Sequence, residues 1–153
     1  MTILYHTFML HLAALVMLLL PIVALSVPPR LYPRTGNNTN TCFSPIGERC
    51  LGRQISPSLA ATAIQKACAQ IPTCVPGQDN YAAVNGKIPG YTATLDLGIQ
   101  CAGVTHWSEE NCKALFTGQI DERCQKIYPS VNFQLGYARS ACDDTFVSLN
   151  FGG

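Results

Sequence analysis

Side chains that could act as acid–base or nucleophilic catalysts are scarce in this 153-residue chain. Beyond residue 41 there is a single histidine, His106. One imidazole cannot supply two-histidine acid–base catalysis or a multi-histidine metal site. A Ser-His-Asp triad could pass only through His106, and no Gly-x-Ser-x-Gly turn accompanies it. The residue types therefore favour a protein that is not an enzyme and carries neither a cofactor nor a metal.

The arrangement of the carboxylates also favours a protein that is not an enzyme. Glu109-Glu110, Asp121-Glu122 and Asp143-Asp144 are adjacent pairs. A glycosidase needs two carboxyl groups that face each other across the scissile bond, whereas neighbours on a helix point about 100° apart. We interpret the pairs as helix-terminal and solvent-facing charges. Asp96 differs, because it falls on the polar side of a predicted strand. It belongs either to an exposed polar site or to an ordinary solvent-facing surface.

The cysteines are the strongest chemical signal. An even number of them in a short domain behind an apolar leader predicts a disulfide framework in an exported protein. Four bridges among eight cysteines allow 105 connectivities, and the spacing does not choose among them. The absence of adjacent cysteines and of Cys-x-x-Cys disfavours hydrophobins, zinc ribbons and thioredoxin-type redox sites. The predicted disulfide cysteines are Cys42, Cys50, Cys68, Cys74, Cys101, Cys112, Cys124 and Cys142.

The first residues are typical of a signal peptide. An apolar run from about Phe8 to Leu25 ends in a small-x-small pattern, which predicts cleavage after Ser26. A retained membrane anchor is the alternative, and the short run with its internal proline argues against it. We therefore expect a signal peptide at 1–26, a flexible Pro- and Asn-rich leader at 27–41 and one domain at 42–153. The protein would be secreted, with no membrane span after cleavage.

The charge pattern limits the classes of partner that the protein is expected to bind. The net charge is +1 and the charged residues are interspersed, so nucleic acid is disfavoured. Asn37-Asn38-Thr39 is a glycosylation acceptor sequence in a polar stretch. Whether Asn37 is glycosylated is left open by the sequence.

Two helices are predicted from caps and apolar spacing. Ser56 with Pro57 is a favoured helix start, and Pro72 ends that helix. Ser108, followed by two glutamates, starts the second helix. The apolar stripe of the second helix is formed by Cys112, Leu115, Phe116, Ile120 and Cys124.

Strands are predicted by strict alternation over Tyr91–Cys101, Val131–Tyr137 and Thr145–Phe151. Asn85-Gly86 is interpreted as a hairpin turn after a strand at 81–84, and a short strand is possible near Cys42–Ile46. Strands with one apolar face and two amphipathic helices predict an α+β fold. This fold is a two-layer sandwich, a mainly antiparallel sheet covered by two helices and stapled by disulfides.

Aromatic side chains are the remaining candidates for binding. Trp107 precedes the cap Ser108 and is either a buried staple on the helix or a platform on which a sugar or a protein stacks. A glycan site there would comprise Trp107, His106 and Ser108, with Asp96 as a more distant member. Tyr81 and Tyr128 are similar candidates in loop-like surroundings.

The order of these features resembles that of small secreted fungal glycan-binding proteins typified by the Coprinus mushroom lectin. The resemblance is carried by Cys42-Phe-Ser, Ala67-Cys-Ala, Gly90-Tyr, Ser108-Glu-Glu-Asn-Cys, Cys124, Phe133-Gln-Leu-Gly-Tyr-Ala and Cys142. It implies a fungal, secreted lectin. A second similarity, in Leu97-Gly-Ile-Gln-Cys, is to fungal killer-toxin-like effectors.

The functional expectation is a secreted binding protein that recognises glycans or a host or competitor cell surface. The alternative is a killer-toxin-like or immunity-modulating effector. The ligand, the target organism and the oligomeric state are not determined by the sequence.

Overall fold

The computed structural model describes residues 43–78, 81–141 and 143–152, with the side chains of 44–48 excepted. The predicted signal peptide, the leader, Asn37, Cys42 and Cys142 lie outside these residues.

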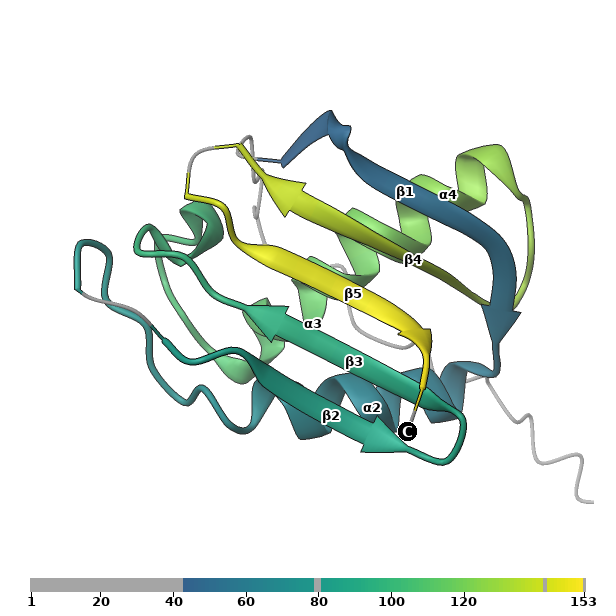
Figure 1. The fold of residues 1–153 in the computed structure, drawn as a ribbon, viewed down its shortest axis with the longest axis horizontal. Helices are drawn as coiled ribbons and strands as arrows, with labels where there is room; N and C mark the ends of the chain where they lie inside the picture. Colours follow the sequence, from purple (N-terminus) through teal and green to yellow (C-terminus); the bar gives the residue numbers. More distant parts are fainter. Residues whose placement is uncertain (1–42, 79–80, 142, 153) are drawn as a thin grey trace, which may run out of the picture. The chain divides into compact units, whose positions relative to one another are not determined.

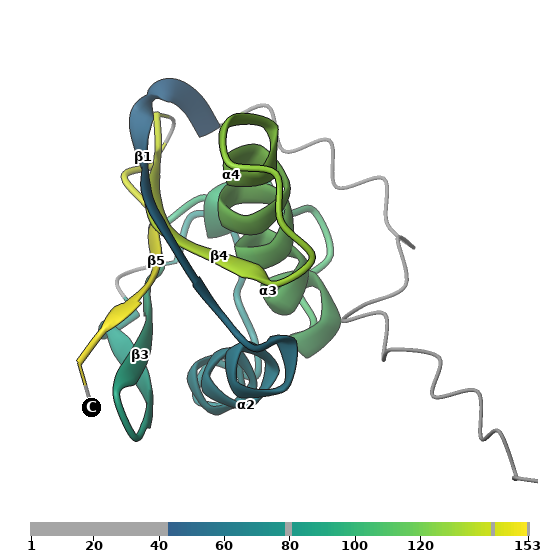
Figure 2. The same cartoon turned by 90° about the vertical axis from the view of Figure 1, so that its right-hand side faces the viewer.

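The described chain forms one five-stranded antiparallel sheet with helices on one face (Figures 1 and 2). The order of strands across the sheet is β1-β4-β5-β3-β2, so β1 and β2 are the edges. The predicted two-layer α+β sandwich is confirmed, as is the predicted order of its elements. The elements are β1 (Phe43–Ile55), α2 (Pro57–Cys68), β2 (Val84–Ile88), β3 (Tyr91–Asp96), α3 (Glu109–Phe116), α4 (Glu122–Ile127), β4 (Phe133–Ser140) and β5 (Phe146–Phe151).

Both predicted helix starts are capped by a serine side chain. Ser56 Oγ accepts a hydrogen bond from Leu59 N at 3.4 Å, and Ser108 Oγ accepts one from Asn111 N at 3.1 Å. The second helix continues from α3 through a π-helical turn, Thr117–Asp121, into α4. Its predicted apolar stripe is buried, because that face packs on the sheet.

Two glycines allow the helices to approach the sheet closely. A complete row of paired residues crosses all five strands: Cys50, Gly136, Leu149, Ala93 and Gly86. A Cβ at Gly86 would lie 1.8 Å from Ala63 O of α2, and one at Gly136 would lie 3.3 Å from Cys124 Sγ. This row therefore faces the helices, and the adjacent residues of each strand face the other side.

The hairpin turn predicted at Asn85-Gly86 is wrong. These residues lie within β2, and the turn to β3 is at Pro89-Gly90, where Gly90 has φ +84°. Gly86 is needed for the approach of α2 rather than for a turn. The strand predicted at 81–84 contributes only Val84 to β2.

The long alternating strand is also shorter than predicted, since β3 ends at Asp96 instead of Cys101. Gly98 N donates to Thr145 Oγ1 at 2.8 Å, and Cys101 and Ala102 adopt φ values of +52° and +57°. These contacts turn the chain away from the sheet. At β4 the strand begins at Phe133 rather than Val131.

Within the described part of the chain, three disulfides join distant elements: Cys50–Cys124, Cys68–Cys112 and Cys74–Cys101. The first joins the edge strand β1 to α4, the second joins α2 to α3, and the third joins two loops. Among the described residues, no helix combines the length and the apolar character that a membrane span requires.

Candidate functional site

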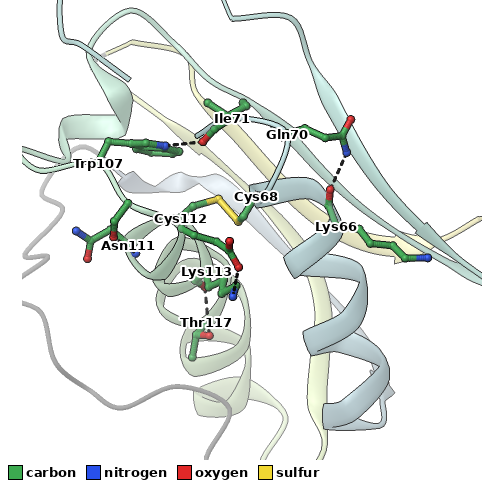
Figure 3. Close-up of a disulfide and its surroundings, with 11 residues drawn as sticks. Lys66, Cys68, Gln70, Ile71, Trp107, Asn111, Cys112, Lys113 and Thr117 are labelled. Carbon is green, nitrogen blue, oxygen red and sulfur yellow. Dashed lines mark hydrogen bonds and ion pairs between the residues drawn. A yellow bond between two sulfur atoms is a disulfide. The ribbon is translucent and has the colours of Figure 1, made fainter. Parts of the chain in front are cut away.

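Trp107 is a packed residue in the structure. Its half-buried side chain lies against the core, and its indole N–H donates to Ile71 O at 2.9 Å (Figure 3). The ring is next to the end of α2, close to the Cys68–Cys112 disulfide. Because its one donor is used internally, the geometry favours the packing role over that of a sugar platform.

The other residues of the predicted Trp107 site have different environments, and only Asp96 belongs to another element. His106 is exposed, and its carbonyl accepts from Asn111 Nδ2. Ser108 uses its hydroxyl to cap α3. Asp96 is the last residue of β3, on the sheet face away from the helices, where it pairs in register with Phe146. Tyr81 is half-buried, and its hydroxyl accepts from Val75 N at 3.0 Å.

Tyr128 has the geometry of an aromatic platform. The ring lies over Gly52 on the side where a side chain would project, because a Cβ added at Gly52 would be 3.4–3.7 Å from three of its ring atoms. The residue is nevertheless 45% exposed. Ile127 at 63% and Val131 at 96% are exposed apolar neighbours in sequence. We call this the Tyr128 surface, defined by Gly52, Gln54, Ile127, Tyr128, Ser130 and Val131.

The fold holds both Gly52 and Tyr128 of the Tyr128 surface in place. Gly52 is two residues after Cys50, which is bonded to Cys124 of α4. Tyr128 follows Cys124 by one helical turn and donates its N–H to Cys124 O at 2.8 Å. The Cys50–Cys124 bridge therefore holds the glycine and the ring against each other across 76 residues of sequence.

Polar side chains lie two residues along the chain from Gly52 and from Tyr128. Gln54 and Ser130 are hydrogen-bonded side chain to side chain, and Ser130 Oγ also accepts from Asn132 N at 3.1 Å. Gln54 is exposed. An amide and a hydroxyl this close in sequence to an exposed aromatic residue can supply directed hydrogen bonds to a ligand that stacks on the ring.

A buried carboxylate stabilises the main chain at Tyr128. Asp121 Oδ1 accepts from Gln134 N at 2.7 Å and from Gln125 Nε2 at 2.9 Å. Burial raises the pKa of Asp121, with the Glu122 charge adding to the effect, and the two hydrogen bonds oppose it. Gln134 Nε2 in turn donates to Tyr128 O at 3.0 Å. Asp121 therefore fixes Gln134, and Gln134 fixes the main chain at Tyr128.

A second carboxylate holds the loops at the other end of the sheet. Asp143 Oδ2 accepts from Gln100 N at 3.1 Å and Ala102 N at 2.8 Å, and Oδ1 accepts from Thr145 N at 3.1 Å. Burial works against ionisation, but the hydrogen bonds outweigh it and lower the pKa of Asp143. Its acceptors are all occupied by the protein, so its role is structural.

Sequence reasoning named Tyr128 but missed Gly52. Nothing in a lone glycine predicts that it will lie under a ring 76 positions away. The signal is structural: Gly52 has φ +60° and lies where the register of β1 against β4 shifts between Cys50 and Gln54. Such an irregularity bends an edge strand and redirects its side chains.

Within the described ranges, no group of three or more His, Cys, Asp or Glu side chains could hold a metal ion. No family model matches the chain, and neither curated proteins nor solved structures give a match.

Proposed function

We propose that this protein is a secreted binding protein that recognises a cell-surface glycan through the Tyr128 surface. The observation that carries the proposal is the Tyr128 ring, which lies over Gly52 while nearly half of the residue stays exposed. A sugar ring has apolar C–H faces and polar edges, so it needs an aromatic face with hydrogen-bonding groups beside it.

Preorganisation supports a binding role. The ring is held by the Cys50–Cys124 bridge, by two main-chain hydrogen bonds of Tyr128 and by the contact with Gly52. A ligand that stacks there does not have to order a flexible side chain, which lowers the cost of binding. Three disulfides in a small α+β domain also fit an extracellular setting.

A glycan-array screen tests the proposal directly. The purified, oxidised protein should bind one class of immobilised glycan, and Tyr128→Ala should lose that binding. Phe151→Ala is the matched control, because Phe151 is an equally exposed aromatic residue, at 57%, on the last strand of the sheet. Retained binding in Phe151→Ala with loss in Tyr128→Ala is the expected result. Binding of uncharged glycans that survives in Tyr128→Ala, or no binding of any uncharged glycan, overturns the proposal.

A further inference from the structure

The sheet face opposite the helices carries an ordered row of polar side chains. In-register pairing joins Asn85 to Thr94, Thr94 to Ser148, Ser148 to Tyr137 and Tyr137 to Arg49. Directly paired residues of antiparallel strands present their side chains on the same face. We call these five residues the polar row. It crosses every strand of the sheet and alternates with the glycine-containing row that faces the helices.

Positively charged side chains lie at both ends of the polar row. Arg49 is its last member on β1, and Lys87 lies two residues from Asn85 on β2, hence on the same face. Four strand spacings of about 4.8 Å separate the two edges, a span of about 19 Å. Both side chains are exposed, and neither is in an ion pair within the described part of the chain.

A third cation has a fixed position beside the row. Arg139 is two residues from Tyr137 on β4, and its guanidinium lies 5.2 Å from the centre of the Phe146 ring. Its Nη1 donates to Asp144 O at 3.1 Å and lies 4.0 Å from Asp144 Oδ1, at the turn into β5. Asp96 is the one carboxylate that the described strand residues place on this face, in the same cross-strand row as Arg139, with Phe146 of β5 between the two.

The middle of the row is neutral and rich in hydroxyl and amide groups. Thr94 Oγ1 donates to Asn85 Oδ1 at 2.8 Å, a bond that does not use the Asn85 amide N–H groups. Hydroxyl and amide groups between two cations match a linear sugar chain with spaced anionic groups. Neither helix covers this face (Figure 2).

We infer that the polar row, with Lys87 and Arg139, binds an anionic polysaccharide laid across the strands. The carboxylates or sulfates of the polymer would contact Arg49, Arg139 and Lys87, and its hydroxyl groups would contact Asn85, Thr94 and Tyr137. Ser148, between Thr94 and Tyr137, is buried and completes the row without reaching the polymer. This site is separate from the Tyr128 surface and does not depend on it. It would hold the protein on an acidic matrix while the Tyr128 surface recognises its own ligand.

The test uses the oxidised full domain and three immobilised polymers: polygalacturonate, dextran sulfate and uncharged dextran. Both anionic polymers, or either one, should bind, and binding should weaken as salt rises from about 0.05 to 0.3 M because exposed charges are screened over about 10 Å or less. The two anionic polymers separate carboxylate from sulfate recognition. Equal binding to uncharged dextran, or binding to no polymer, overturns the inference.

Charge-matched variants separate this site from a net-charge effect. Lys87→Gln and Lys126→Gln each remove one positive charge, but exposed Lys126 is on α4. Asp96→Asn and Glu110→Gln each remove one negative charge, but exposed Glu110 is on α3. Lys87→Gln should weaken polyanion binding about two- to fivefold, and Asp96→Asn should strengthen it by a similar factor, the range that exposed charge pairs give.

The two helix variants should stay close to the wild type. If the two lysine variants, or the two carboxylate variants, changed polyanion binding equally, binding would depend on net charge alone. That result would overturn the inference. Tyr128→Ala should leave polyanion binding unchanged, so failure of this inference and failure of the Tyr128 proposal are distinguishable.

Discussion

The ring of Tyr128 lies over Gly52, on the side where a side chain would project: a Cβ added there would be 3.4–3.7 Å from three ring atoms, in ordinary van der Waals contact. The two are joined through Cys50 and Cys124 rather than through sequence proximity. A solvent-facing aromatic side chain in a short connection is thereby fixed in position. The binding role proposed for the protein depends on this contact.

Gly52→Ala should lower both stability and ligand binding. The new Cβ would be in ordinary van der Waals contact with the Tyr128 ring, but alanine is strained at φ +60°, and relief of that strain would shift the main chain beneath the ring. The backbone strain should cost about 1 kcal/mol of unfolding free energy. Gly77→Ala is the matched control, because Gly77 has φ +84° with no atom within 4 Å of its would-be Cβ. Thermal melts should show similar losses, while only Gly52→Ala weakens binding. Equal binding by the two variants would contradict the contact's role.

The Cys50–Cys124 bridge should matter more for binding than the Cys74–Cys101 bridge. Replacing either pair by alanine should reduce the unfolding free energy by roughly 2–5 kcal/mol. Only the first pair holds β1 against α4 at the Tyr128 surface. Titrations below both melting temperatures should therefore show weaker binding for the Cys50→Ala/Cys124→Ala protein alone. If both double variants bind equally well, the bridge does not preorganise the surface.

Asp143 should make the fold acid-sensitive. Its pKa is lowered in the folded chain, so its contribution is present above its ordinary value, 3.8, and is lost as the pH falls through the lowered value. Asp143→Asn should remove this part of the pH dependence and destabilise the protein at neutral pH. Urea unfolding at pH 7 and near pH 3 measures it. A variant as pH-dependent as the wild type in this range would exclude Asp143 as the source.

The sequence predicts four disulfides, and three are described. The cysteines left over are Cys42 and Cys142, which lie outside the described residues, so a fourth bridge would join these two. Peptide mapping of the unreduced protein should recover that linked pair, and the denatured protein should contain no alkylatable thiol. A free thiol at either position would show that the prediction of four bridges is wrong.

Local sequence signals predicted the helices and the fold well. They could not predict contacts between residues that are far apart in the sequence. Ser56, Pro57 and Ser108 mark helix starts because a cap acts on its own first turn. Gly86 was misread as a turn residue because its function is contact with α2, 23 positions away at Ala63. The polar row could not be predicted for the same reason, since its five members come together only through strand register.

Chemical-shift mapping of the backbone amides with the glycan found on the array tests the central claim most directly. The proposal predicts that the largest perturbations fall on Gly52, Gln54 and residues 127–132, with small changes around Trp107, His106 and Ser108 and along the polar row. Saturable perturbations centred on Trp107 or spread over the outer sheet face, with Gly52 and Tyr128 unchanged, would contradict it.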